Sequence, residues 1–351
     1  MKNIAIVSFY SGISERGVET FALEIGNRLA QKNKVTVFQA GHTPTQKYKI
    51  VEINTSARPP KSSKGILGKI YLDLQSLRIL VFSIKIIPML IKGKYDLIIP
   101  LNGGYQIAIF RIISKLTGAK LLVSGHAGIG ADDAWNLFFR PDIFVALTIA
   151  ELEWAKKITP EVKLETIPNG VDLSKFNPQV KPKPISLPGP IVICTSALIP
   201  YKQVDLTIKA AAKAKLSLLI LGEGEMQGTL DSLGKRLLGK KYLRLVVPYM
   251  EIASYYRACD VFTLASRTEA FGISYIEAMA CNLPVVTTCD SSREEIIGNA
   301  GILTNPQNVD QYAKDLTLAT KTNYRNLPYN QALKFSWNKI TERYQKLINN
   351  L

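Results

Sequence analysis

The chain has 351 residues, of which 47% are hydrophobic and 21% are charged, a composition typical of a soluble globular protein. It is too long for one ordinary hydrophobic core and suggests two α/β domains. The formal net charge is +16, and residues 47–94 alone hold ten lysines and arginines against two acidic residues. This excess favours an anionic partner, namely a membrane surface, a nucleic acid or a phosphorylated acceptor, although a solvated basic face is an equally good interpretation.

The cysteines and histidines argue against a zinc site and against a disulfide framework. The four cysteines (Cys194, Cys259, Cys281 and Cys289) lie among apolar neighbours without a C-x-x-C pair, and the only histidines are His42 and His126. We therefore expect buried free thiols. The first residues form one short apolar run rather than the longer core and cleavage site of a signal peptide, so we expect a cytoplasmic protein.

Short runs of β-branched and other apolar residues alternate with longer helical patterns along the whole chain. Such near-continuous apolar runs predict parallel strands with helices on both faces, and two successive sets predict two doubly wound sheets. The runs are 3–9, 34–39, 48–53, 96–101, 120–125 and 143–148 in the first half, and 191–197, 216–222, 243–248, 261–266 and 284–289 in the second.

A proline-rich segment separates the two sets. Residues 178–190 contain five prolines, which cannot continue a helix or a central strand, so we expect a linker there. The predicted organisation is an N-terminal domain over 1–177, this linker, a second domain over 191–335, and a C-terminal amphipathic helix within 336–351 that packs back on the first domain. Since ligands bind beyond the carboxyl ends of parallel strands, we expect the site in a cleft between the domains.

Residues 66–92 form an unusually apolar stretch in which Arg78, Lys85 and Lys92 recur every seven residues. This spacing places the cations along one helical face, and Pro88 should kink or end the helix. The run from Ile79 to Ile91 is too short to span a bilayer. A core helix covering the first sheet and a helix lying in the membrane interface both remain open.

The segment 266–284, SRTEAFGISYIEAMACNLP, carries the most specific signal. Glu269 and Glu277 stand eight residues apart, and the whole string resembles the E-x7-E motif of retaining glycosyltransferases of the GT-B fold, most closely family 4. Gly272 permits a tight turn into a helix whose N-terminus can bind a diphosphate. On this resemblance Glu277, expected on the first helical turn, accepts hydrogen bonds from a ribose diol. Glu269 meets the sugar or the positive charge that develops at its anomeric carbon.

Other segments resemble the same family in order and spacing: 15–30, 166–178, 196–210, 218–230 and 249–272. The segment SALIPYKQVDLTIKA makes Lys202 the counterpart of the family's diphosphate-binding lysine, which would stabilise the leaving group. The histidine that lies near the transferred sugar in relatives corresponds to His126. The donor-binding residues implied by the resemblance are Glu277, Phe271, Gly272, Ile273, Gly17, Ser196 and Gly222.

Two positions depart from the family pattern. The family's second diphosphate-binding cation, an arginine, is Ala197 in this chain, and one of two glycines in the N-domain loop is Arg16. We expect another cation to substitute, and Arg16 is one candidate. Asp132-Asp133 lacks the D-x-D spacing of a metal site, so we interpret it as a helix N-terminus or a loop. GT-B enzymes generally act without a divalent ion, so no metal or other cofactor is expected.

The resemblance implies a GT-B fold of two Rossmann-like domains and a retaining, metal-independent transfer of a hexosyl unit from a nucleotide-diphospho-sugar. The expected acceptor is a glycan or a lipid-linked glycan of cell-envelope polysaccharide or glycolipid synthesis. We expect no nucleic-acid partner, and peripheral attachment to an anionic inner membrane surface through 47–94 is a further hypothesis. The alternatives are a catalytically silent accessory subunit, or a GT-B sugar epimerase or phosphorylase. A Rossmann oxidoreductase is disfavoured because Gly12 and Gly17 do not form G-x-G-x-x-G.

Overall fold

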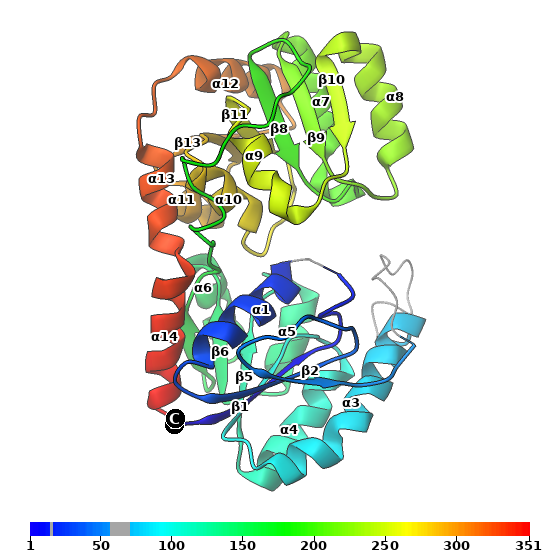
Figure 1. Cartoon of the computed structure of the whole chain (residues 1–351), viewed down its shortest axis with the longest axis vertical. Coiled ribbons are helices and arrows are strands. Elements are labelled where there is room, and N and C mark those ends of the chain that lie inside the picture. Colours follow the sequence, from blue (N-terminus) through cyan, green and yellow to red (C-terminus); the bar gives the residue numbers. More distant parts are fainter. Residues whose placement is uncertain (15–16, 57–70) are drawn as a thin grey trace. The chain divides into compact units, whose positions relative to one another are not determined.

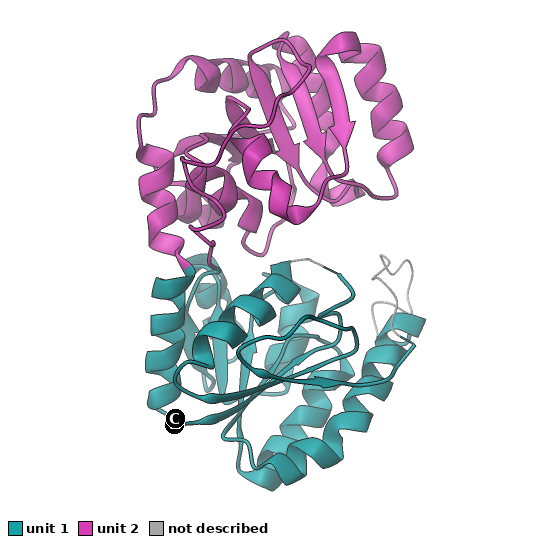
Figure 2. Ribbon diagram, viewed as in Figure 1, with its two compact units in different colours: residues 1–169, 337–351 teal, residues 170–336 magenta. Residues whose placement is uncertain are grey.

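The structure is a computed structural model that describes residues 1–14, 17–56 and 71–351. The chain forms two compact units (Figure 2). Unit 1 comprises Met1–Asn169 and Trp337–Leu351, and unit 2 comprises Gly170–Ser336. Each unit is built on its own parallel β-sheet with helices packed against it (Figure 1).

Unit 1 contains a seven-stranded sheet of order β3-β2-β1-β4-β5-β6-β7. Every strand pair in it is parallel, as the apolar runs predict. The strands are β1 (Asn3–Ser8), β2 (Lys34–Gln39), β3 (Lys49–Glu52), β4 (Leu97–Pro100), β5 (Lys120–Ser124), β6 (Ile143–Ala146) and β7 (Lys163–Thr166). The described helices are α1 (Gly17–Leu29), α3 (Leu74–Gly93), α4 (Tyr105–Thr117), α5 (Ala131–Phe138), α6 (Ile149–Ile158) and α14 (Trp337–Asn349).

Both faces of this sheet are buried. Along β1, Ile4 and Ile6 pack into a core with α1 and α14, whereas Ala5 and Val7 pack into a second core with α3 and α4. The alternation follows from the two-residue period of a strand. The C-terminal helix therefore belongs to the first unit, where Tyr344 is fully buried.

Unit 2 contains a six-stranded parallel sheet of order β10-β9-β8-β11-β12-β13. Its strands are β8 (Ile191–Thr195), β9 (Ser217–Leu221), β10 (Tyr242–Leu245), β11 (Val261–Leu264), β12 (Val285–Thr288) and β13 (Gly301–Thr304). Its α-helices are α7 (Val204–Lys213), α8 (Gln227–Leu238), α9 (Ile252–Tyr256), α10 (Ile273–Ala280), α11 (Ser291–Ile297), α12 (Val309–Lys321) and α13 (Leu327–Ala332), and its short 3₁₀ turns are η1 (Pro200–Lys202), η2 (Gly239–Lys241), η3 (Tyr249–Glu251) and η4 (Leu333–Phe335). In both sheets the order reverses beside the first strand, as in doubly wound nucleotide-binding folds.

The unit boundary differs from the predicted one. The chain passes between the units at Asn169–Gly170, and the proline-rich segment lies within unit 2. Lys183 donates its backbone N–H to the Ser254 carbonyl at 2.9 Å, and its ammonium lies 2.8 Å from Glu251 Oε2. Prolines prevent this segment from joining a sheet or a helix, but they do not prevent it from packing as an extended strap on its own domain.

Helix α3 does not end at Pro88, one of the two outcomes expected there, because it continues through this residue to Gly93. Phe82, Ile86 and Leu90 are buried in the core of unit 1, so α3 covers the first sheet. This is the core-helix interpretation, one of the two left open by the sequence.

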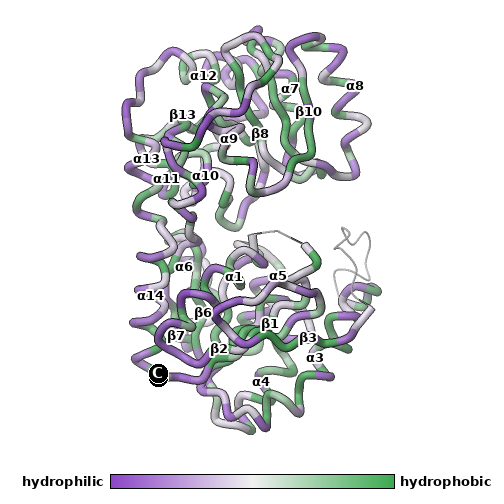
Figure 3. The backbone as a smooth tube through the Cα atoms, in the orientation of Figure 1, coloured by the Kyte–Doolittle hydropathy of each residue, from purple (hydrophilic) through white to green (hydrophobic). Residues whose placement is uncertain are grey.

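Hydrophobic residues recur along α3 (Figure 3), and several of those on the side opposite this core, such as Val81 and Ile84, are exposed. The run from Ile79 to Ile91 suggested a segment too short to span a bilayer, but the helix is longer than that run: Leu74–Lys92 is long and apolar enough to cross a membrane by length and composition alone. Core helices also pass this test, and 22% of that window is buried.

All four cysteines are free, as expected, but they are not all buried. Cys194 and Cys281 are buried, whereas Cys289 is exposed and Cys259 is intermediate. Cys289 follows the end of β12, in the connection to α11, where the apolar run gives way to a surface turn.

Candidate functional site

In unit 2, the loops after β8 and β11 bring two of the expected catalytic residues together. These strands are neighbours at the point where the strand order reverses, which is where open α/β sheets bind ligands. Lys202 ends the turn η1 after β8, and Glu269 lies in the loop after β11. Lys202 Nζ lies 2.6 Å from Glu269 Oε1, and their side chains are only 15% and 11% exposed.

The backbone joins the same two loops. The N–H of Arg267 donates to the Tyr201 carbonyl at 2.8 Å, and the Lys202 ammonium lies 5.3 Å from the centre of the Tyr201 ring. The ion pair is thus held by short segments on adjacent strands rather than by two free side chains.

A third loop, which follows β9, packs backbone to backbone against the loop that follows β8. The N–H of Ser196 donates to the Leu221 carbonyl at 3.1 Å, and that of Leu198 donates to the Glu223 carbonyl at 2.9 Å. A Cβ atom on Gly222 would lie 2.0 Å from the Ser196 carbonyl oxygen, so this position requires glycine. Ser196 and Gly222, both expected at the donor, therefore lie side by side at the carboxyl edge of the sheet.

Helix α10 begins directly after Gly272, whose φ of 85° and ψ of 68° lie in the left-handed region. Glu277 is 4% exposed and accepts a hydrogen bond from the Tyr249 hydroxyl. It lies in the second turn of α10 rather than the first, since the helix begins at Ile273. Burial raises the pKa of the Glu277 carboxyl to about 7, and the bond from Tyr249 opposes that rise.

The two residues that flank Gly272 have different environments. Phe271 is 3% exposed and packs edge-to-face on Phe335, with ring centres 5.7 Å apart. Its side chain belongs to the core of unit 2, which leaves only its backbone for a donor contact. Ile273 is partly exposed at the first position of α10.

Several cations lie near these loops, and most are already paired. Arg293 is 1% exposed and donates to the Ser266 carbonyl at 2.9 Å and to Asp290. Arg244 binds Asp231 through two nitrogens and donates to the Gly222 carbonyl at 3.2 Å. Arg267, by contrast, is exposed and lies two residues before Glu269. The candidate Arg16 lies outside the described residues.

The remaining two expected residues belong to unit 1. Gly17 is the exposed first residue of α1. His126 follows β5, and its ring packs edge-to-face on Phe21 at 4.5 Å. Its Nε2 is shielded from solvent and has no hydrogen-bond partner among the residues that the structure describes. Burial lowers the pKa of His126 to about 4, so the imidazole is neutral at physiological pH.

Asp132 and Asp133 occupy the first turn of α5, which confirms their interpretation as a helix N-terminus. Asp133 is fully buried and accepts hydrogen bonds from the backbone N–H groups of Ala127 at 3.1 Å and Gly128 at 2.7 Å. It thereby fixes the loop that carries His126. Burial raises the pKa of Asp133 and also that of the adjacent Glu151. No group of three His, Cys, Asp or Glu residues able to hold a metal occurs in the described part of the chain.

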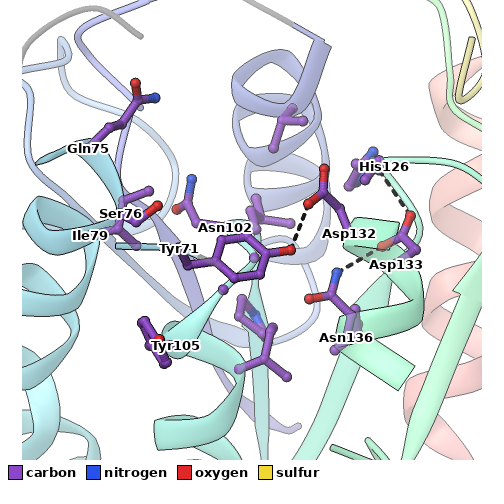
Figure 4. Close-up of a pocket in the computed structure, with 18 of the residues that line it drawn as sticks. Tyr71, Gln75, Ser76, Ile79, Asn102, Tyr105, His126, Asp132, Asp133 and Asn136 are labelled. Carbon is purple, nitrogen blue, oxygen red and sulfur yellow. Dashed lines mark hydrogen bonds between the residues drawn. The ribbon is translucent and has the colours of Figure 1, made fainter. Parts of the chain in front are cut away.

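A cavity of about 350 Å³ opens beside this loop, and sequence reasoning did not find it (Figure 4). It lies at the carboxyl ends of β1, β4 and β5, the equivalent edge of the first sheet. His126, Asp132 and Asp133 contribute to its lining together with residues that carried no motif, such as Tyr71 and Asn136. Nothing in the local sequence distinguishes these last two, because the topology alone brings them together.

Two doubly wound sheets with polar loops at their carboxyl edges define this chain as a GT-B protein. It belongs to glycosyltransferase family 4. Residues 16–175 match the model described as Glycosyltransferase Family 4, and residues 176–334 match Glycosyl transferases group 1. The motif-based prediction of the family is therefore confirmed.

Individual proteins with similar sequences or similar folds agree with this family assignment. A Corynebacterium glutamicum protein named GDP-mannose-dependent monoacylated alpha-(1-6)-phosphatidylinositol monomannoside mannosyltransferase is 29% identical over 43% of this chain and 45% of its own, so the chain matches about half of that relative. Anabaena HepE, solved with UDP and glucose, aligns over 100% of both chains with a TM-score of 0.77 and 18% identity. Sucrose-phosphate synthase from Thermosynechococcus elongatus aligns over 100% of this chain and 99% of its own, with a TM-score of 0.76 and 18% identity. These structures confirm the predicted fold.

Proposed function

We propose that this protein is a retaining glycosyltransferase that moves a hexosyl unit from a nucleotide-diphospho-sugar to a glycan or lipid-linked acceptor. The observation that carries the proposal is the pairing of Lys202 with Glu269 at the reversal point of the second sheet. The family membership and the folds of the UDP complexes support a nucleotide sugar as donor.

The donor's diphosphate would bind where Lys202, Gly222 and the N-terminus of α10 lie. The ammonium and the unpaired N–H groups of the helix stabilise the negative charge that grows on the leaving group. Glu277 would accept hydrogen bonds from the ribose hydroxyls in place of the one from Tyr249. Arg267, exposed beside the ion pair, would supply the second positive charge that Ala197 does not provide.

Retention would follow if the acceptor attacks from the face that the diphosphate leaves, with a diphosphate oxygen taking its proton. The protein then contributes position and charge stabilisation rather than a strong nucleophile. Glu269 would orient the sugar, His126 keeps the role near the sugar that the family resemblance implies for it, and we expect no metal ion in the step.

The exposed face of α3 supports a peripheral location on an anionic membrane, and hence a cytoplasmic enzyme of envelope polysaccharide or glycolipid synthesis. Leu74, Leu77, Val81, Ile84 and Ile91 form this apolar stripe and are 41% to 65% exposed. The first four are spaced by three, four and three residues, Ile91 follows Ile84 after seven, and Arg78, Lys85 and Lys92 directly follow three of the five. An apolar stripe beside cations is the pattern by which a helix lies in the interface of an anionic bilayer.

The test measures products from a panel of nucleotide sugars, with membrane glycolipid extracts as acceptors. An acceptor-dependent product that keeps the donor's anomeric configuration by NMR supports the proposal. Conversion of the donor without any acceptor would indicate an epimerase, and phosphate-dependent breakdown would indicate a phosphorylase. Donor-induced thermal stabilisation without turnover with any extract would favour the silent accessory subunit.

A further inference from the structure

The cavity of unit 1 carries an unsatisfied hydrogen-bond acceptor. Asn136 is 6% exposed, and its Nδ2 donates to Asp133 Oδ1 at 2.8 Å. Its Oδ1 is buried and has no partner among the described residues, although Asn136 lines the cavity. A buried amide oxygen without a donor is costly, so this atom favours a ligand that brings an O–H or N–H group.

Glycine forms the cavity lining next to that oxygen. A Cβ atom on Gly103 would lie 3.5 Å from Asn136 Oδ1, within contact distance of that oxygen. Gly103 and Gly104 follow β4, so bare backbone forms this part of the cavity lining. The oxygen itself is shielded from solvent, so a ligand hydroxyl would reach it after a local shift of this bare backbone.

The charged groups of the cavity are acids. Asp73, Asp132 and Asp133 line it, and no lysine or arginine is among its described lining residues. Asp132 is exposed and accepts a hydrogen bond from the Tyr71 hydroxyl at 2.6 Å (Figure 4). Carboxylates accept hydrogen bonds from hydroxyl groups but repel phosphates and carboxylates, which themselves bring mainly acceptors.

Aromatic rings supply a surface for the apolar face of a sugar ring. Tyr71 and Tyr105 line the cavity, and Trp135 packs against both with ring centres 5.3 Å and 6.2 Å away. The indole Nε1 donates to the Gly104 carbonyl at 3.0 Å, which fixes the cluster to the loop after β4. Tyr71 also has a φ of 56°, an uncommon value for a residue with a side chain, so its backbone is held in place at some cost.

We propose that this cavity binds an uncharged, hydroxyl-rich glycosyl unit of the acceptor and rejects phosphorylated or acidic sugars. This inference rests on the proposed function, which supplies the reason for an acceptor site, and it narrows the acceptor class. The cationic charge of α3 would then serve the membrane surface, while the acceptor's terminal sugar is recognised by acids, an amide and aromatic rings.

The experiment measures binding to the full chain without any donor, by saturation-transfer NMR and chemical-shift titration. Its probes are methyl α-glucopyranoside and the 6-phosphate of the same glycoside, which differ only in the phosphate. The variants are Asp132→Lys in the cavity and Glu153→Lys on the exposed face of α6, which change the charge equally. Thermal melting checks that each variant is folded.

The expected result is at least tenfold weaker binding of the phosphate than of the neutral glycoside in the wild type and in Glu153→Lys. Asp132→Lys should reduce or reverse that ratio. Equal or tighter binding of the phosphate by the wild type would overturn the inference, as would binding of neither probe or identical ratios in the two variants. The binding measurement needs no turnover, so its outcome is independent of the transfer assay. The preference for the neutral glycoside can be found even if the protein transfers no sugar, and sugar transfer can be found even if that preference is absent.

Discussion

Lys202 and Glu269 form an ion pair of 2.6 Å across 67 residues of sequence. Both side chains are mostly buried, so either charge alone would be poorly solvated. The pair therefore keeps the lysine in place before any donor binds. A diphosphate would give the ammonium a second anionic partner, and Glu269 would then be free to turn toward the sugar.

The first prediction concerns Lys202→Met, which removes the ammonium and keeps much of the side-chain volume. Loss of one positioned electrostatic contact to a leaving group should lower kcat by about 100-fold to 1000-fold. Initial-rate measurements of glycosyl transfer check it. Lys209→Met, which removes an exposed ammonium 2.8 Å from Asp205 on α7, is the matched control and should change kcat by less than about twofold. A similar small effect in both variants would refute the assigned role of Lys202.

The two glutamates of the motif should separate kinetically. Glu269→Ala removes a group that acts on the reacting sugar, so it should lower kcat, whereas Glu277→Ala should chiefly raise the donor KM. Steady-state kinetics over a range of donor concentrations distinguish the two effects, with the exposed Glu294→Ala as control. Equal losses of kcat in both motif variants, without a change in KM, would contradict this division.

The raised pKa of Glu277 predicts a pH-dependent stability. Its folded value is about 7 and its usual value is 4.5, so the folded state holds an extra proton between these values and loses stability as pH rises through that window. At pH 4.5 the Glu277→Gln variant should therefore have nearly the same stability as the wild type. At pH 8 its free energy of unfolding should exceed that of the wild type by about 3 kcal/mol at most, and its Tm should be correspondingly higher. Donor-free melting curves across this range measure the difference, and a constant difference in Tm would show that Glu277 does not titrate there.

Glycine at position 222 should be irreplaceable. An alanine Cβ there would meet the Ser196 carbonyl oxygen at 2.0 Å, so the loops after β8 and β9 must separate. We expect Gly222→Ala to cost about 1–3 kcal/mol and to weaken donor binding. Gly228→Ala, in α8 with no atom within 4 Å of its Cβ, should be neutral or stabilising. Thermal melting with and without nucleoside diphosphate compares the two, and a Gly222→Ala protein as stable as Gly228→Ala would disprove the packing argument.

Much of the fold followed from the apolar runs, since each predicted run contains a strand of the structure or, for β10, overlaps one. The strands that were missed, β7 and β13, lie at sheet edges and are four residues long. An edge strand has one neighbour, so much of KLET and GILT stays partly exposed and neither forms a long apolar run. The boundary was misplaced for a related reason, because prolines mark irregular backbone without indicating which domain it packs on.

The site residues that belong to sequence motifs could be predicted. Lys202, Glu269 and Glu277 were named from short strings, but the ion pair was not, because only the adjacency of β8 and β11 brings the two loops together. Tyr249 and Asn136 were missed altogether. Their roles depend on a buried carboxylate and on an open cavity, and neither feature can be read from residue spacing.

The last prediction tests the membrane surface through Ile84, which is 51% exposed at the middle of the stripe on α3. Ile84→Glu places a negative charge between the apolar stripe and Lys85, so it should reduce both apolar burial and attraction to anionic lipid. Sedimentation with phosphatidylglycerol vesicles at low salt should fall at least fivefold, while Leu318→Glu, at a 55% exposed site on α12 of unit 2, should sediment like the wild type. Binding should also weaken with added salt and be lower on neutral phosphatidylcholine vesicles, since surface charges are screened. If the wild-type protein stays in the supernatant with anionic vesicles, the proposed peripheral membrane location is refuted. The exposed apolar stripe would then require a protein partner.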